Sequence, residues 1–171
     1  MEFPSMDYYL VDVASKFSSR LETMVWWEDF KVGDISDMGS YRFTEAEIVA
    51  FARQFDPQPF HTDPEAAARS PFGGLIASGW HTCAIGMRLM VEGYIRRTAS
   101  LGSPGVDNIR WLKPVRPGDT LAYRRTVLES RASASRPGVG LVRHRWEALN
   151  QDGEIVLSME GWGMFGRKPA A

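Results

Sequence analysis

The sequence has a single cysteine, Cys83, and no long apolar run. One cysteine excludes an internal disulfide and a multi-cysteine metal site, and no stretch is long enough to cross a bilayer as a helix. The formal net charge of −1 gives no electrostatic basis for binding nucleic acid. We therefore expect neither a nucleic acid nor a membrane as a partner, and a cytoplasmic location, which we also expect, fits the single cysteine without following from it.

The first 23 residues lack the basic start of a signal peptide and contain Asp7 and Asp12. We expect residues 1–24 to form an N-terminal arm instead. The rest of the chain has the mixture of apolar and charged residues that is typical of globular proteins, and its length suffices for one hydrophobic core. We therefore predict a single domain over residues 25–171.

Two helices are indicated in the first half of this domain. Residues 44–47 form a capping box, in which a threonine and a glutamate satisfy the first N–H groups of a helix. That helix is predicted to end at Asp56, because Pro57 disfavours helical geometry in the residue before it. Asp63-Pro64 then predicts the start of a short helix over residues 65–69.

Residues 26–34, near the start of the domain, are predicted to be a short strand or an entry loop.

The second half of the domain changes from a helical to a strand pattern. A buried helix is expected to present Trp80, Cys83, Ala84, Met87, Met90, Val91, Tyr94 and Ile95 to the core, because they recur at helical spacing. Antiparallel strands follow at 106–115, 120–129, 139–149 and 154–165. This order predicts an α+β fold, with the sheet either wrapped around the helix or open beneath it.

Asp56 and His61 lie five residues apart in a proline-rich segment. Histidine exchanges protons near neutral pH, and an aspartate can orient it or take a second proton. Pro57 and Pro59 remove two backbone donors and stiffen the segment, which would fix both side chains before a substrate arrives. The pair is therefore the candidate centre for water chemistry. The alternative is a helix-terminal aspartate beside a turn histidine, with no catalytic role.

Ser78 and Gly79 stand where the buried helix is predicted to begin. Serine is a good N-cap. The Gly79 N–H has no intrahelical partner and no side chain to block approach, so it can stabilise an oxyanion. The alternative for Gly79 is a glycine required only for packing. Gln58 can donate and accept hydrogen bonds beside the Asp–His pair, or it can be a solvated loop amide.

Other polar residues have weaker signals. His81 is expected to be structural or at the edge of a pocket, because its spacing from His61 and Asp63 matches no zinc pattern. His144 is expected to be exposed or at an interface, and Cys83 to be a small core residue.

The basic cluster Arg110, Lys113 and Arg116 is either a solvated face or a surface for phosphates. A few large apolar side chains line a pocket or simply belong to the core. They are Phe60, Phe72, Trp80 and Met87.

Four stretches of the sequence, in order, resemble the MaoC-like dehydratase family of hot-dog proteins, relatives of the (R)-specific enoyl-CoA hydratases. They are Trp27–Phe30 with Val32–Asp34, Asp56–His61, Phe72–Gly74 with Ile76–Gly79, and Trp111–Asp119. The resemblance implies a hot-dog fold, in which a curved antiparallel sheet wraps a long central helix. It also implies pairing into homodimers or larger homo-oligomers.

The resemblance assigns roles to individual residues. Asp56 and His61 would bind the reacting water, and Gly79 would supply the amide of an oxyanion hole. His61 would take a proton from water as it attacks C3, and Asp56 would orient that water and deliver a proton to C2. Three positions depart from the family pattern: Gln58 for the usual Asn, Phe55 for Gly and Ala84 for Ser.

We therefore expect reversible hydration of a 2-enoyl thioester, with CoA present only as part of the substrate and no metal or redox cofactor. Substrate contacts are expected from Gln58, Phe60, Ser78, Trp80, Arg110 and Lys113. The alternatives are a hot-dog acyl-CoA thioesterase and a non-catalytic subunit that binds acyl-CoA.

Overall fold

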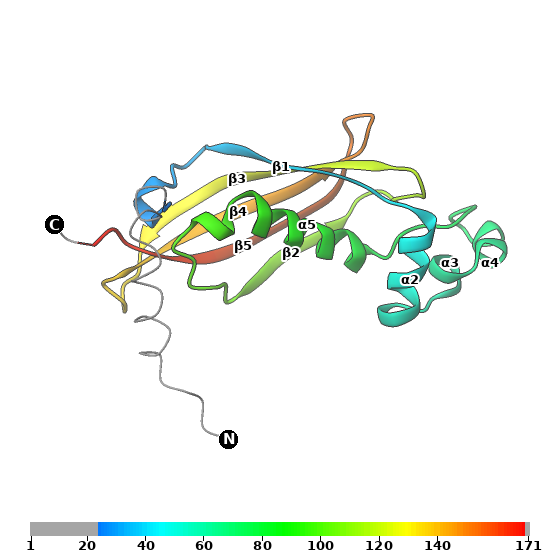
Figure 1. Cartoon of the computed structure of the whole chain (residues 1–171), viewed down its shortest axis with the longest axis horizontal. Helices are drawn as coiled ribbons and strands as arrows, with labels where there is room; N and C mark the ends of the chain where they lie inside the picture. The colour runs from blue at the N-terminus through cyan, green and yellow to red at the C-terminus, as the bar shows by residue number, and fades with distance from the viewer. Residues whose placement is uncertain (1–23, 170–171) are drawn as a thin grey trace, which may run out of the picture.

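The computed structural model describes residues 24–169 of the chain. Within them a curved antiparallel sheet faces one long helix (Figure 1). The sheet has five strands in the order β1-β3-β4-β5-β2, and every neighbouring pair is antiparallel. The strands are β1 (Ile35–Arg42), β2 (Gly105–Trp111), β3 (Thr120–Ala132), β4 (Val139–Leu149) and β5 (Ile155–Gly166). The predicted arm lies outside the described residues, apart from Met24.

Helix α5 (Gly79–Gly93) lies along the sheet, and three shorter helices gather beyond its N-terminal end (Figure 1). This arrangement confirms the predicted α+β, hot-dog fold. The remaining helical segments are η2 (Trp27–Asp29), α2 (Glu45–Phe55), α3 (Pro59–Thr62), α4 (Pro64–Ala68) and η3 (Ile95–Arg97). Among residues 24–169, no helix is long and apolar enough to cross a membrane.

The predicted helix boundaries are confirmed where capping chemistry defined them. The Thr44 hydroxyl accepts a hydrogen bond from the Glu47 N–H, and α2 ends one residue before Asp56. Asp63 caps α4 through its carboxylate. The strand predicted over 106–115 ends earlier, at the end of β2, because the chain turns there toward its connection with β3.

One strand was missed, and one of two alternatives for an earlier segment was not realised. In β1 only Met38 is buried, so the strand lacks the apolar alternation by which strands are predicted. Gly39 also interrupts its register with a bulge and a φ of +101°. Residues 26–34 form a loop that contains the 3₁₀ turn η2, which agrees with the predicted entry loop and not with the alternative of a short strand.

The predicted buried face of α5 was wrong for Trp80, Ala84 and Met87, which are exposed, whereas Met90 is buried and Cys83, Tyr94 and Ile95 pack against the core. Trp80 is 54% exposed and Met87 is 45% exposed. The residues that face the core are His81, Thr82, Ile85, Gly86, Leu89 and Met90. The reason is close packing: Tyr123 of β3 lies against Gly86, and its hydroxyl donates to the Thr82 carbonyl at 3.0 Å. Small and polar residues therefore share the buried face of α5 with Ile85, Leu89 and Met90, whereas Trp80 and Met87 lie on the outer face.

The expectation that His144 is exposed was also wrong. Alternation along β4 turns Arg143 and Arg145 outward to Glu160, and turns His144 inward. Its ring is fully buried among aromatic side chains, with its centroid 5.4 Å from that of Trp146. Neither ring nitrogen has a hydrogen-bond partner in the described part of the chain. Burial, with a smaller contribution from the charge of Arg125, lowers the pKa of His144 to about 3.

His144 is therefore expected to make the fold sensitive to acid. The unfolded histidine binds a proton near pH 6.5, whereas the folded one stays neutral down to about pH 3. Stability is thus complete above the unfolded pKa and is lost as the pH falls below it, by about 3 kcal/mol at pH 4.5. Urea unfolding at pH 7.5 and 4.5 should show a smaller difference for His144→Leu than for the wild type. An equal difference in both proteins would contradict this assignment.

Candidate active site

Two prolines place His61 beside Asp56. Asp56 is the C-cap of α2, and Pro57 ends that helix. Pro59 is the first residue of the next helical turn, α3, so the chain resumes a helix almost at once. This sharp break turns the His61 ring back toward the preceding carboxylate. The Nε2 atom of His61 lies 3.4 Å from Oδ2 of Asp56, and the histidine is buried.

A backbone carbonyl fixes the protonation pattern of this histidine. Nδ1 of His61 lies 2.8 Å from the carbonyl oxygen of Ile76. A carbonyl oxygen can only accept, so Nδ1 holds the proton and donates. In the neutral ring Nε2 therefore presents a lone pair toward Asp56. Two acceptors face one another at 3.4 Å, and either a shared proton or a water molecule can satisfy both.

The Asp56 carboxylate is held by two side-chain donors. The Ser78 hydroxyl donates to Oδ2 at 2.7 Å, and the Gln58 amide donates to Oδ1 at 2.8 Å. Burial opposes ionisation of Asp56, but these hydrogen bonds and the field of His61 outweigh it and lower the pKa of the carboxyl group below its usual value. The carboxylate is thus ionised at neutral pH and available as an acceptor.

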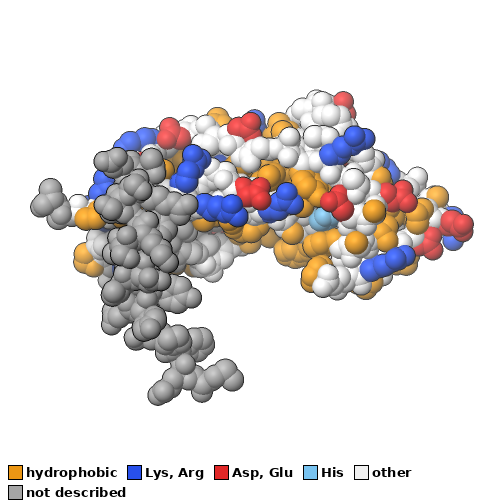
Figure 2. Space-filling view, in the orientation of Figure 1, with side chains coloured by type: hydrophobic (Ala, Val, Ile, Leu, Met, Phe, Trp, Pro, Cys, Tyr) orange, Lys and Arg blue, Asp and Glu red, His pale blue; other side chains and the backbone are white. Residues whose placement is uncertain are grey.

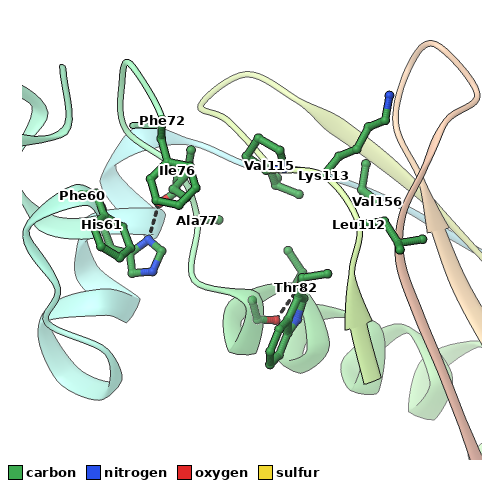
Figure 3. Close-up of a pocket in the computed structure, with 13 residues that line it drawn as sticks. Phe60, His61, Phe72, Ile76, Ala77, Thr82, Leu112, Lys113, Val115 and Val156 are labelled. Carbon is green, nitrogen blue, oxygen red and sulfur yellow. Dashed lines mark hydrogen bonds between the residues drawn. The ribbon is translucent and has the colours of Figure 1, made fainter. Parts of the chain in front are cut away.

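A pocket of about 410 Å³ opens beside this pair. Figure 3 shows His61 and Phe60 at one side of it, Leu112 and Val156 at the other, and Phe72 above. Most of the lining is apolar, whereas His61 and the backbone of Gly79 bring polar atoms to it. Asp56 is not part of the lining and meets the pocket only through His61. The arrangement suits an apolar substrate whose reacting atom is presented to the histidine.

Gly79 begins α5, and its N–H makes no hydrogen bond within residues 24–169. A Cβ at this position would overlap the indole of Trp111. The structure therefore gives the glycine a packing role, which was one of the two predicted alternatives. Because the Gly79 N–H has no partner among the described residues, the predicted role as an oxyanion donor stays open beside the packing role.

The other predicted contacts are only partly brought together. Phe60 and Lys113 line the pocket. The Lys113 ammonium pairs with Glu154 and extends away from His61 in Figure 3. Arg110 and Trp80 are exposed and do not line the pocket.

Ser78 and Gln58 serve the site indirectly, because each contacts Asp56. Ser78 is also the predicted N-cap of α5, which is confirmed: its hydroxyl accepts from the Trp80 N–H at 3.2 Å.

Three contributors to the site were missed. Trp111 and Thr82 line the pocket, and the Ile76 carbonyl orients His61. Trp111 lies two residues after Ile109 in a predicted strand, so both side chains are expected on the same face of the sheet. The position of Trp111 beside the pocket could therefore have been found from the sequence. The His61 ring contacts only the backbone of Ile76, and no side-chain pattern in the sequence signals this contact.

His81 was predicted to be structural or at the edge of a pocket. Its ring stacks on that of Phe51, with the ring centroids 4.6 Å apart.

Among residues 24–169, no group of three or more His, Cys, Asp or Glu side chains could hold a metal ion.

Comparisons with known proteins show the family and the fold of the chain. The family model described as "MaoC like domain" matches residues 33–145. A solved structure of a MaoC-like dehydratase from Rhodospirillum rubrum is 44% identical, with a TM-score of 0.78, over 85% of this chain and 99% of that chain. The uncharacterized protein YdeM of Bacillus subtilis is 30% identical over 66% of this chain and 79% of its own length. Mesaconyl-CoA hydratase of Cereibacter sphaeroides is 45% identical over 36% of this chain and 18% of its length.

If Gly79 is required for packing against Trp111, the effects of substitutions at these two positions on the free energy of unfolding should not be additive. Gly79→Ala should lower the free energy of unfolding by about 1–3 kcal/mol, because the new methyl group meets the Trp111 indole. In a Trp111→Ala background the same change should cost nothing, because the obstacle is gone and alanine favours helix. Urea unfolding of the four proteins measures this coupling. Equal costs in both backgrounds would mean that Trp111 is not the reason for the glycine.

Proposed function

The chain belongs to the MaoC-like domain family, and from this premise we propose that it catalyses reversible hydration of a 2-enoyl thioester. The observation that supports this most is the pair of facing acceptors, His61 Nε2 and Asp56 Oδ2, at 3.4 Å. Their protonation pattern is suited to one water molecule that donates to both. The proposed reaction uses no redox cofactor, because water addition changes no oxidation state overall.

The proposed reaction begins with the thioester oxygen at the Gly79 N–H. The water oxygen attacks C3 as His61 takes one of its protons at Nε2. The electron pair of the C2=C3 bond moves onto the thioester, and the resulting enolate oxygen is stabilised by the amide at the positive end of α5. The ionised Asp56 stabilises the imidazolium that forms on His61. The proton taken from the water then passes from this Asp–His pair to C2. The product has gained one water.

We propose an acyl-CoA as the substrate and the cytoplasm as the location. Similarity to mesaconyl-CoA hydratase over part of the chain supports a CoA thioester. The apolar lining of the pocket supports an acyl chain without charge near C3. Lys113 is proposed as a contact for the CoA moiety at the rim, where it would exchange its present partner Glu154 for a phosphate.

We also propose that the protein forms a homodimer or larger homo-oligomer through the outer face of α5. Trp80, Ala84 and Met87 share this face, and Trp111 and Leu112 continue it at the end of the edge strand β2. Figure 2 shows hydrophobic side chains gathered over this region of the molecule. A continuous apolar surface beside an unpaired strand edge is typical of association surfaces.

Hydration can be tested with crotonyl-CoA and several branched and dicarboxylic enoyl-CoAs, each followed by mass change. The wild type should add one water to at least one of them. Asp56→Asn and His61→Gln should each lower kcat/KM by at least about a hundredfold, because each removes a group that holds or deprotonates the water. Gln54→Ala, at an exposed position of α2, is the matched control.

The same assay separates the alternatives. Release of free thiol, detected with a thiol-reactive dye, would indicate a thioesterase. Binding without turnover across the whole panel would indicate a non-catalytic subunit. Activity that survives both site substitutions unchanged would refute the assignment of Asp56 and His61.

The association proposal predicts that a charge on the outer face of α5 reduces the oligomeric state. Met87→Glu should shift the sedimenting species toward the monomer, because burying a carboxylate in an apolar interface is unfavourable. Gln54→Glu adds the same charge to an exposed part of α2 and should leave the mass unchanged. A monomeric wild type at micromolar concentration, or an unchanged mass for Met87→Glu, would contradict the proposal.

A further inference from the structure

One wall of the pocket includes Phe72, a loop residue whose backbone is hydrogen-bonded to a residue far along the chain. We propose that Phe72 limits the size of the acyl group and that Arg116 is a positioning residue that holds Phe72 in place. This inference rests on the proposed function and narrows the substrate class to enoyl groups with a short chain beyond C3.

Phe72 belongs to an aromatic row that leads directly to the reacting position. Its ring centroid is 5.1 Å from that of Phe60, which in turn lies 4.5 Å from that of His61. All three side chains line the pocket. If C3 faces His61 and the thioester oxygen faces Gly79, the chain beyond C3 points toward Phe60 and Phe72. The position of the Phe72 ring then decides how many further carbons fit.

The backbone at Phe72 has no regular secondary structure to hold it. It lies in the segment between α4 and α5, followed by Gly73 with a φ of +65°. The local ties are to Ser70, whose hydroxyl accepts from the Phe72 N–H at 3.2 Å and whose carbonyl accepts from the Gly73 N–H at 3.0 Å. Both ties lie within the same short turn, so they shape the loop but do not fix it to the rest of the protein.

Arg116 supplies the long-range tie. Its Nη2 donates to the Phe72 carbonyl at 2.7 Å, across 44 positions of sequence. A Cβ at Gly74 would lie 3.3 Å from Nη1, so the glycine leaves room for the guanidinium. Within residues 24–169, Arg116 takes part in no ion pair, so this contact is the main use of its charge.

The backbone of Arg116 is itself fixed to the core. Its N–H donates to the Asp119 carboxylate at 2.7 Å, which closes a turn before β3. That turn is joined to Phe43, which is fully buried, by two backbone hydrogen bonds of 2.8 Å from either side. The guanidinium therefore extends from a rigid support to a loop that lacks one. Such an arrangement restrains the Phe72 ring without contact between Arg116 and a substrate.

The test is the dependence of kcat/KM on chain length for 2-enoyl-CoAs of four to ten carbons. Phe72→Ala should raise the ratio of long-chain to crotonyl-CoA kcat/KM about tenfold or more, and Phe72→Leu should raise it less, because each removes part of the wall. Arg116→Gln should shift the ratio in the same direction through KM, with kcat for crotonyl-CoA nearly unchanged. Arg116→Lys, which keeps one charged donor, should restore part of the selectivity.

Arg69→Gln is the matched control, since it removes an exposed arginine near the same loop and should leave the ratio unchanged. An unchanged ratio in Phe72→Ala would overturn the size limit. Equal losses of kcat on every substrate in Arg116→Gln would overturn the positioning role.

The outcome can be separated from that of the proposed function. If the wild type hydrates no enoyl-CoA, the proposed reaction fails, and the size limit is then measured as the ratio of Kd values for decanoyl-CoA and butyryl-CoA by calorimetry. A ratio that Phe72→Ala does not change, or a wild type that binds neither ligand, overturns the inference as well.

Discussion

The hydrogen bond from Nδ1 of His61 to the Ile76 carbonyl is the constraint on which the rest of the site depends. It leaves Nε2 without a proton in the neutral ring, and so defines an acceptor opposite an ionised carboxylate. The same two segments are joined a second time, because the Ile76 N–H donates to the Phe60 carbonyl at 3.2 Å. The imidazole is therefore oriented by backbone that its own short helix helps to hold, and neither segment can move without the other.

Ser78 connects this constraint to the second half of the site. Its hydroxyl donates to Asp56 and accepts from the Trp80 N–H, so one oxygen links the carboxylate to the first turn of α5. Ser78, one of the two donors that lower the pKa of Asp56, is thus fixed to the helix whose first amide has no partner among the described residues, at Gly79. In the proposed reaction, the acceptors for water and the donor for the oxyanion would therefore share one rigid frame, which is the preorganisation that catalysis of water addition requires.

Local chemistry could be predicted from the sequence, and packing between distant elements could not. The capping box at Thr44, the break at Pro57 and the cap at Asp63 act within a few residues, and each defines a boundary that the structure confirms. The buried face of α5 depends instead on Tyr123 approaching Gly86, a contact that no helical periodicity contains. In the candidate site, the neighbourhood of Asp56 and His61 followed from their spacing, whereas the Ile76 carbonyl has no sequence signature.

The position of Trp111 links the site to the outer surface of the molecule. Its indole packs on Gly79 and meets Trp80 edge to face at 5.3 Å, and it is half-exposed at the end of the edge strand β2. One side chain thus forms part of the pocket lining and part of the apolar face of α5. Association through that face would bury the free side of the indole and restrict its motion over the Gly79 amide. In such an assembly the geometry of the oxyanion donor and the stability of the interface would depend on the same contact, so substitutions at Trp111 should affect both together.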